Sequence, residues 1–209
     1  MYTEVFTHHP APNKGAELRA TLEERSRAAN SAGSPHLVGQ LLYAAEPTFV
    51  NAIRHESLAA LEDYGNRRAG DPSFQAFLSK TAVADARPPS SALYESLVAA
   101  APTGAVTYAL WRTFYPAPGK VGELRAAIEK RAHTPSPGAV GKVVYSHIHG
   151  PDRNHFVLIT LFPSLAAYES YFKAQPTDPA VQAFAAQVGG IAAAGGRSDL
   201  YRVLLAFPG

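Results

Sequence analysis

The segment PAPNKGAELRA at residues 10–20 recurs as PAPGKVGELRA at residues 116–126, an offset of 106 residues. Three more pairs follow in the same order and at nearly the same offset: SLAA at 57–60 and 164–167, DPSFQAF at 71–77 and DPAVQAF at 178–184, and LY at 93–94 and 200–201. Similarity between alanine-rich helices accounts for one such match but not for four in register. The sequence therefore predicts an internal duplication.

Outward from these repeats, each half shows the same series of elements. Strands are predicted at 3–8, 37–45, 49–55 and 93–98, and again at 108–115, 140–149, 155–162 and 200–207. A helix with apolar positions at helical spacing follows the first strand of each half. Ser57 and Ser164 are predicted to cap a second helix, and Asp71-Pro72 and Asp178-Pro179 to begin a short third helix.

The order β-α-β-β-α-β is that of a ferredoxin-like unit, in which helices cover one face of the sheet. Strands such as VLITLF at 157–162 are apolar at successive positions, so both of their faces must be buried. The predicted fold class is α+β, with two tandem ferredoxin-like units that form an intramolecular pseudo-dimeric α/β barrel. The halves are predicted at 1–101 and 105–209, joined by the small-residue stretch 99–104.

Composition excludes several classes of protein. The 209 residues carry a net charge of +2 with acids and bases interspersed, which argues against nucleic acid or a membrane surface as a partner. The absence of cysteine excludes thiol chemistry and fits a cytoplasmic protein. No signal peptide or membrane-spanning run is visible. The expected partner is a small hydrophobic substrate, and the expected assembly is a monomer or weak homodimer.

The chain also resembles a known family. The proline–lysine stretch before the first helix, LVG at 37–39 and AVG at 139–141, and the DPxxQAF motif resemble NIPSNAP-family domains of the dimeric α/β-barrel superfamily, which includes the antibiotic-biosynthesis monooxygenases. The resemblance implies a barrel with ligand pockets between sheet and helices. It also implies varied chemistry, from cofactor-free oxygenases to heme proteins, dehalogenases and members without a settled activity.

Differences between the halves indicate where chemistry was added. In the second half, Tyr145, His147 and His149 alternate along one strand, which places them on one face. The predicted catalytic residues are His147, Tyr145 and Arg112, with imidazole as the acid or base and guanidinium as the anion holder. The predicted substrate-binding residues are Trp111, His149 and His155. The bland alternative is that the histidines flank a solvated turn and Tyr145 belongs to the core.

The first half has its own group of polar residues, which we interpret as structural and not as part of a functional site. His8 and His9 end the first strand, and Asn51, Arg54 and His55 lie on the third. Arg54 and His55 point to opposite faces, so they do not share a cavity. The glycine-rich stretch 188–196 is predicted to be a loop over the pocket mouth. The main pocket is therefore expected in the second half.

A metal site and a heme site are alternatives to a site without a cofactor. Gly141 followed by His147 and His149 matches the start of a cupin metal motif, with His155 as a third ligand, but the cupin glutamate is missing. The resemblance makes heme an alternative, with His133 as the only helical candidate in the second half. Neither a metal nor a cofactor is expected.

The function predicted from the sequence is an enzyme that oxygenates or rearranges a hydrophobic aromatic or polyketide-like substrate without an organic cofactor. A non-catalytic ligand-binding or structural NIPSNAP-like protein is the alternative, and a heme or metal protein is a minor one.

Overall fold

The computed structural model describes residues 1–44 and 46–207, and its contacts divide into two compact units. Unit 1 holds Met1–Tyr94 together with His149–Pro151 and the C-terminal stretch from Val203, and unit 2 holds Glu95–Ile148 and Asp152–Arg202. In the part of the chain that is described, no helix combines the length and the apolar character needed to cross a bilayer.

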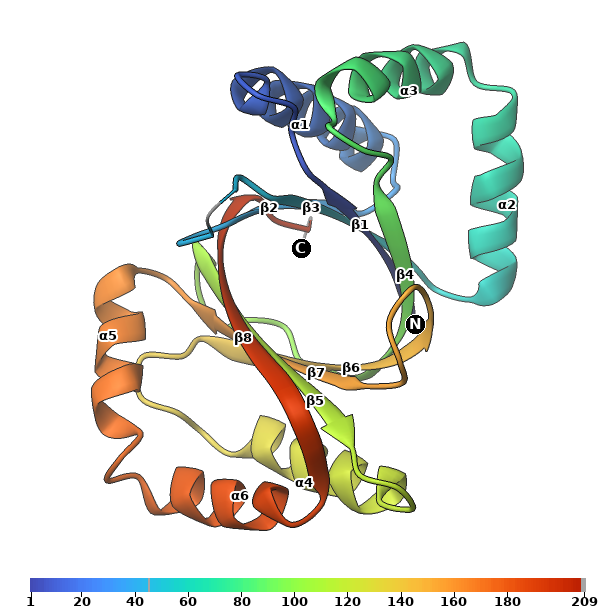
Figure 1. Ribbon diagram of the computed structural model, residues 1–209. Helices are drawn as coiled ribbons and strands as arrows, with labels where there is room; N and C mark the ends of the chain where they lie inside the picture. The colour runs from blue at the N-terminus through green and yellow to red at the C-terminus, as the bar shows by residue number, and fades with distance from the viewer. Residues whose placement is uncertain (45, 208–209) are drawn as a thin grey trace. The chain divides into compact units, whose positions relative to one another are not determined.

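Unit 1 begins the chain with a strand–helix–strand–strand–helix–helix–strand series (Figure 1). The elements are β1 (Tyr2–His8), α1 (Gly15–Ser31), β2 (His36–Leu41), β3 (Phe49–His55), α2 (Leu58–Ala69), α3 (Pro72–Ala84) and β4 (Ser90–Ala99). Unit 2 repeats the series with β5 (Tyr108–Pro116), α4 (Val121–His133), β6 (Gly141–His149), β7 (Phe156–Phe162), α5 (Leu165–Ala174), α6 (Pro179–Gly189) and β8 (Ala192–Leu205).

The strands are antiparallel and follow the closed order β1-β3-β2-β8-β5-β7-β6-β4, in which neighbours are hydrogen-bonded. Two strands contribute residues to both units. The second half of β4 counts with unit 2, and the end of β8 from Val203 counts with unit 1. The predicted fold class, α+β with two ferredoxin-like units in one chain, is confirmed.

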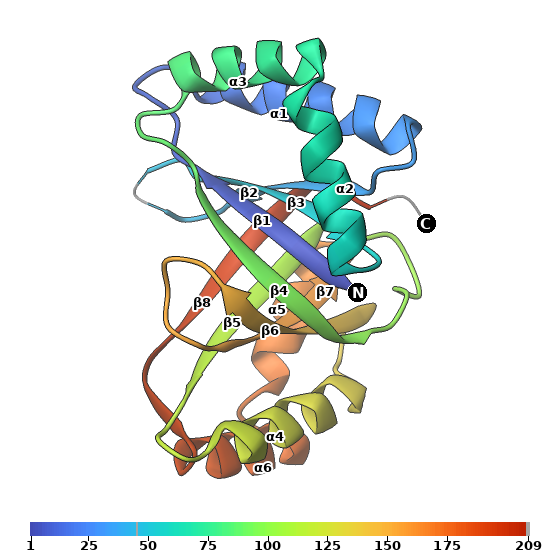
Figure 2. The ribbon, with the colours of Figure 1, turned by 90° about the vertical axis from the view of Figure 1, so that its right-hand side faces the viewer.

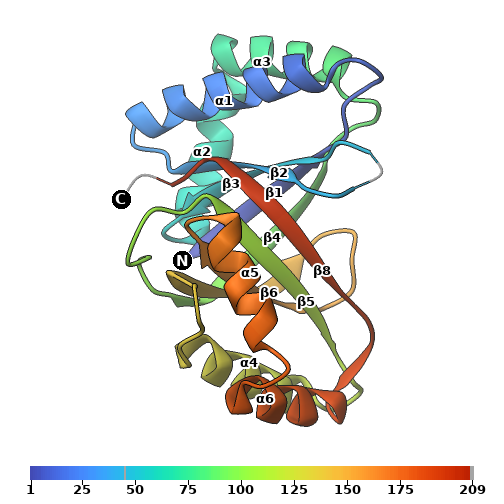
Figure 3. The same cartoon turned by 90° about the vertical axis from the view of Figure 1, so that its left-hand side faces the viewer.

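In each unit the helices cover one face of the sheet. In unit 1, α1 and α3 lie side by side over β1, β3 and β2 (Figure 2), and in unit 2, α4 and α6 do the same over β5 and β7 (Figure 3). Leu18 and Leu22 of α1 pack on Val38 and Phe49. In unit 2 the equivalent cluster is formed by Leu124, Ile128, Val144, Phe156 and Leu158. These apolar contacts hold the helices on their sheets.

The predicted helix caps are confirmed. Ser57 and Ser164 accept hydrogen bonds from the backbone N–H three residues later, at Ala60 and Ala167. Asp71 and Asp178 accept from the N–H two residues later, each with proline at the first helical position. The caps satisfy N–H groups that a helix start leaves without intrahelical partners.

The predicted loop at 188–196 is wrong, because α6 runs to Gly189 and β8 starts at Ala192. The pairing of β8 with β5 shifts register between Thr113 and Tyr115, opposite Gly195 and Gly196. Gly195 has a φ of 99°, and a Cβ on Gly196 would lie 2.9 Å from the Thr113 carbonyl oxygen. The glycines therefore mark a bulge inside a strand.

The predicted strand 37–45 is also shorter in the structure, since β2 ends at Leu41 and Ala45 lies outside the described residues. Strand register gives the counterpart of Tyr145 in the first half. Gly39 pairs with Val50 and Tyr145 pairs with Val157, so the counterpart is Gly39. Tyr43 is exposed and has a φ of 60°.

Two left-handed glycines give a matched test of packing. Gly138 has a φ of 73°, and a Cβ there would overlap the carbonyl oxygen of Ala167, whereas Gly33 has a φ of 80° and open space around it. Both Gly→Ala changes carry the left-handed penalty, roughly 1 kcal/mol. Gly138→Ala should destabilise by about 3 kcal/mol because of the added overlap. Urea unfolding measures both, and equal losses would contradict this packing.

Candidate functional site

A cavity lies inside unit 1, between the sheet and its helices. One wall is formed by β1, β2 and β3, and the other by α1, α2 and α3. The space that the centres of water molecules can occupy is about 60 Å³, enough for several waters or a small organic group. Its apolar lining comes from Phe6, Ile53, Phe74, Phe77 and Leu78, and its polar lining is formed by His8, Arg25, His36, Asn51, Tyr64, Arg68 and Thr81.

Strand register explains why these strand residues meet. Directly opposed residues of an antiparallel pair lie on the same face of the sheet. Phe6 is opposite Asn51, and Ile53 is opposite both Glu4 and His36. Because side chains alternate along a strand, His8 shares the face of Phe6. The cavity-lining strand residues therefore all point to the face that the helices cover.

His8 and Asp85 form a buried pair at one end of this face. The Nδ1 atom of His8 lies 2.8 Å from Oδ2 of Asp85, and the two residues are 3% and 9% exposed. Backbone contacts hold the two segments of the pair together. Pro10 and Asp85 form an isolated antiparallel β-bridge, and the Ala86 N–H donates to the His9 carbonyl at 2.7 Å. A carboxylate on Nδ1 orients the ring and leaves Nε2 as the proton-accepting nitrogen.

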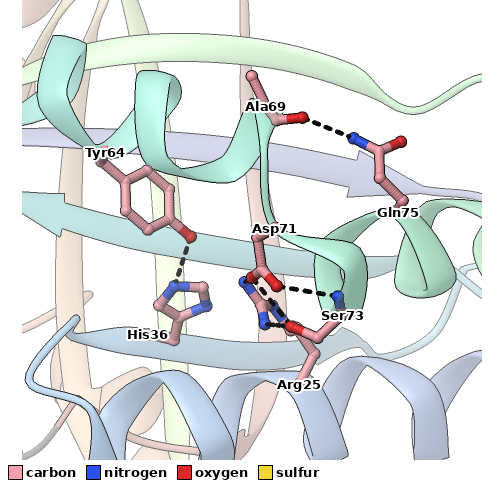
Figure 4. A network of polar contacts seen from close by, with 7 residues as sticks. All are labelled: Arg25, His36, Tyr64, Ala69, Asp71, Ser73 and Gln75. Carbon is pink, nitrogen blue, oxygen red and sulfur yellow. Dashed lines mark hydrogen bonds and ion pairs between the residues drawn. The ribbon is translucent and has the colours of Figure 1, made fainter.

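His36 and Tyr64 form a second buried pair (Figure 4). The Nε2 atom of His36 lies 3.0 Å from the Tyr64 hydroxyl, and His36 is 1% exposed. Asn30 fixes the His36 backbone, because its side chain accepts from the His36 N–H at 2.5 Å and donates to the His36 carbonyl at 3.1 Å. This places the ring of the first residue in β2 against α2.

The pKa of His36 reports the electrostatics of the site. This pKa is lowered from 6.5 to about 3, mainly by burial and in addition by the positive charges of Arg25 and Arg68. Burial raises the pKa of Tyr64. Near neutral pH both groups are uncharged, so one hydrogen lies between the Tyr64 hydroxyl and Nε2. In the tautomer in which the phenol donates, the remaining imidazole proton sits on Nδ1.

Two guanidinium groups make the cavity electropositive. Arg68 lies over the rings of Phe74, Tyr64 and Phe6, with its Cζ 3.9, 4.9 and 5.7 Å from the ring centroids. Its nearest acid is Glu4 at 3.8 Å, whose pKa burial raises. Arg25 donates to Ser73 at 3.1 Å and lies 3.4 Å from Asp71 (Figure 4).

The equivalent positions of unit 2 are filled differently. By strand pairing, His8 corresponds to Phe114 and Asp85 to Ala192, so an apolar pair replaces the polar one. His36 corresponds to Lys142, which lies opposite Thr160. Lys142 is buried and donates to the carbonyls of Arg131 and Thr134. Burial, with Arg131 next in effect, lowers its pKa to about 7.

The residues predicted in the second half divide between two faces of its sheet. Tyr145 and His147 alternate along β6, and pairing through β7 puts Trp111 on the same face. His147 and His155 are buried and stacked, with ring centroids 4.5 Å apart. His149 is exposed.

Arg112 lies on the opposite face, toward the helices. It donates to Oε1 of Gln175 at 2.9 Å and lies over the Tyr171 ring. The structure thus brings Tyr145, His147, His155 and Trp111 to one face and separates Arg112 from them. Among the described residues, no group of three His, Cys, Asp or Glu side chains is placed to hold a metal ion.

Sequence reasoning named His8, Asn51 and His55 in the first half but interpreted them as scaffold. It missed Asp85, His36, Tyr64 and Arg68. His55 lies behind Tyr64, with ring centroids 5.2 Å apart, whereas Arg54 points away and lies over Phe207. One feature of the sequence could have indicated this site. His36, at the start of a strand, aligns with Lys142 of the other half, so both halves carry a basic residue there.

No protein-family model matches the chain, and no curated protein matches its sequence. Solved structures share its fold. A protein of Fusobacterium nucleatum with the provisional name of monooxygenase is 13% identical with a TM-score of 0.77, over 97% of this chain and 92% of that one. A protein of Lactobacillus acidophilus with the same provisional name is 11% identical with a TM-score of 0.72, over 100% of this chain and 96% of that one. An anthrone oxidase-like protein is 18% identical with a TM-score of 0.68, over 97% of this chain and 91% of that one. The chain has the dimeric α/β-barrel fold of these proteins.

The low pKa of His36 predicts a pH dependence of stability. The unfolded chain takes up a proton on this residue below pH 6.5 and the folded chain does so only near pH 3, so folded-state stability falls as pH falls between these values. Between pH 7 and pH 5 the expected loss from this group is about 2 kcal/mol. Urea unfolding at both pH values should show a smaller loss for His36→Gln than for the wild type, and equal losses would contradict a neutral His36.

Proposed function

We propose that the chain is an enzyme that oxidises a small, electron-rich aromatic compound with O₂ in the cavity of unit 1, without an organic cofactor. The observation that carries the proposal is the His8–Asp85 pair at a cavity whose other walls are aromatic rings and guanidinium groups. Solved structures that share the fold and bear monooxygenase and anthrone oxidase names support the reaction type.

The pair supplies the base. Asp85 holds Nδ1 of His8, and Nε2 takes the proton of a phenol or of the acidic C–H of its keto tautomer. Removing that proton leaves an electron-rich enolate or phenolate, which transfers electrons to O₂ in single steps. Such anions react with O₂ because the negative charge raises the energy of the electrons that are donated.

The substrate carbon, written as CH₂ in the keto tautomer, loses a proton to His8 and forms a C–O bond with O₂, and the proton returns to the distal oxygen. The hydroperoxide then loses water and leaves a carbonyl group. The net change is CH₂ plus O₂ to C=O plus H₂O, in which the carbon is oxidised and the dioxygen reduced.

The walls suit an anionic substrate. Arg68 and Arg25 line the cavity, while the carboxylates of Glu4, Asp71 and Asp85 do not. Two fixed positive charges without an acid in the lining favour a substrate that carries a negative charge. The small size of the cavity disfavours a polycyclic substrate.

We further propose that the chain arose by duplication of a NIPSNAP-like unit and that chemistry was kept in one copy. The matched segments at 10–20 and 116–126 enter equivalent helices, α1 and α4. The replacement of His8 and Asp85 by Phe114 and Ala192 supports an active first unit.

Oxygen consumption with a panel of phenols and hydroquinones tests the function. His8→Gln should lower kcat at least 100-fold because the base is lost, and Asp85→Asn should lower it about tenfold because the ring loses its orienting carboxylate. His133→Gln, a change at an exposed histidine of α4, should keep the wild-type rate.

Three results would overturn the assignment. Unchanged oxygen consumption in a folded His8→Gln protein would remove His8 as the base. Loss of turnover in His147→Ala together with wild-type turnover in His8→Gln would move the reaction to unit 2. Ligand binding without oxygen consumption by any substrate in the panel would leave a binding protein.

A further inference from the structure

We propose that the unit 1 cavity recognises an aromatic acid, with its carboxylate held at the His36–Arg68 end of the cavity and its opposite end presented to His8. The inference names the substrate class of the proposed enzyme, and it rests on that function only in taking the His8 end as the reacting end. Four observations carry it.

The first observation is the imbalance of charge. Arg25 and Arg68 both line the cavity, and no acidic side chain does. The Asp71 carboxylate lies 3.4 Å from Arg25 and also accepts from Ser73, but Arg68 has only Glu4 at 3.8 Å. Because 3.8 Å is beyond hydrogen-bond distance, Glu4 compensates the charge of Arg68 only in part. A ligand anion would complete that pair.

The second observation is a set of buried polar atoms without hydrogen-bond partners among the described residues. They are Nδ1 of His36, Nε of Arg68 and Oδ1 of Asn51. Their residues all line the cavity, and His36 and Asn51 are 1% and 4% exposed. Leaving such groups unpaired is costly, so their presence points to a polar ligand.

These atoms have the polarity that an acid requires. Arg68 Nε–H is a donor, and Nδ1 of His36 is a donor as well when Nε2 accepts from Tyr64. Two donors beside a guanidinium group match a carboxylate, which accepts at both oxygens. Oδ1 of Asn51 is an acceptor, and it suits a hydroxyl group on the ring.

The third observation is the spacing of the polar groups along β3. His36 is opposite Ile53, and His8 is opposite Phe49. Four residues of strand separate the two positions, roughly 13 Å between backbones. Asn51 lies midway, opposite Phe6. A single-ring acid held at the His36 end therefore reaches Asn51, at about half this distance, and its far side faces the His8 end.

The fourth observation is the contrast with unit 2. Arg68 and Gln175 each lie four residues before the proline of an Asp-Pro helix cap, Pro72 and Pro179, so Gln175 is the counterpart of Arg68, and His36 corresponds to Lys142. There Arg112 donates to Gln175, and Lys142 donates to two backbone carbonyls. These polar side chains of unit 2 thus have hydrogen-bond partners within the unit, whereas Nδ1 of His36 and Nε of Arg68 in unit 1 have none among the described residues.

Calorimetry with benzoate, 4-hydroxybenzoate and the neutral analogue benzamide tests the inference on the full chain at pH 7 and low salt. The wild type should bind benzoate at least tenfold more tightly than benzamide, and 4-hydroxybenzoate more tightly than benzoate. Arg68→Gln, which installs the unit 2 residue, should lower benzoate affinity at least tenfold and leave benzamide affinity unchanged. Arg27→Gln, the same change at an exposed position of α1, should alter neither.

Equal binding of benzoate and benzamide by the wild type, or undiminished benzoate binding by Arg68→Gln, would overturn the proposal. The wild-type comparison decides the matter even if Arg68→Gln does not fold. The outcome is separable from that of the proposed function. Benzoate binding without oxygen consumption would remove only the enzyme, and oxygen consumption with equal kcat/KM for neutral and acidic phenols would remove only the carboxylate site.

Discussion

The burial of polar groups between the sheet and the helices of unit 1 is the constraint on which the rest of the structure depends. A buried imidazole, guanidinium or carboxylate is tolerated only when a partner compensates for the water it has lost. His8 has Asp85, and His36 has Tyr64. Each pair joins a strand to a helix or to the residue just after one, so the polar contacts also set where the helices lie.

The same constraint explains the electrostatic character of the cavity. Arg68 stacks on three aromatic rings instead of reaching a close carboxylate, and its charge keeps the neighbouring imidazoles neutral. Burial lowers the pKa values of both His36 and His55, and Arg68 adds to each shift. A neutral imidazole donates through one nitrogen and accepts through the other, which a protonated ring cannot do.

Unit 2 shows that the fold does not require this arrangement. Its sheet and helices have the same order, yet Phe114 and Ala192 pack where unit 1 has the His8–Asp85 pair. Arg112 comes from the strand, where unit 1 has Phe6, and it lies over Tyr171 as Arg68 lies over Tyr64. A cation on an aromatic ring is thus kept in both units, but it comes from different elements.

The sequence by itself determined the two-unit architecture, because its signals are local. The Ser and Asp-Pro caps and the alternation of side chains along β6 each depend on residues close together in the chain, and the repeat is found by comparing short segments letter by letter. The start of β8 differs from the prediction for the same reason: its glycines have the local signature of a loop, but pairing with β5 makes them a bulge in a strand.

Only the tertiary structure decided the site. His8 and Asp85 are 77 positions apart, and His36 and Tyr64 are 28 apart. Strand pairing and helix docking bring them together, and no spacing rule in the sequence encodes those contacts. The contrast between the halves favours Tyr145 and His147 as site residues, because they are polar side chains on an otherwise apolar strand. Which polar residues share a buried face depends on register, and register is set by the packing of the whole sheet.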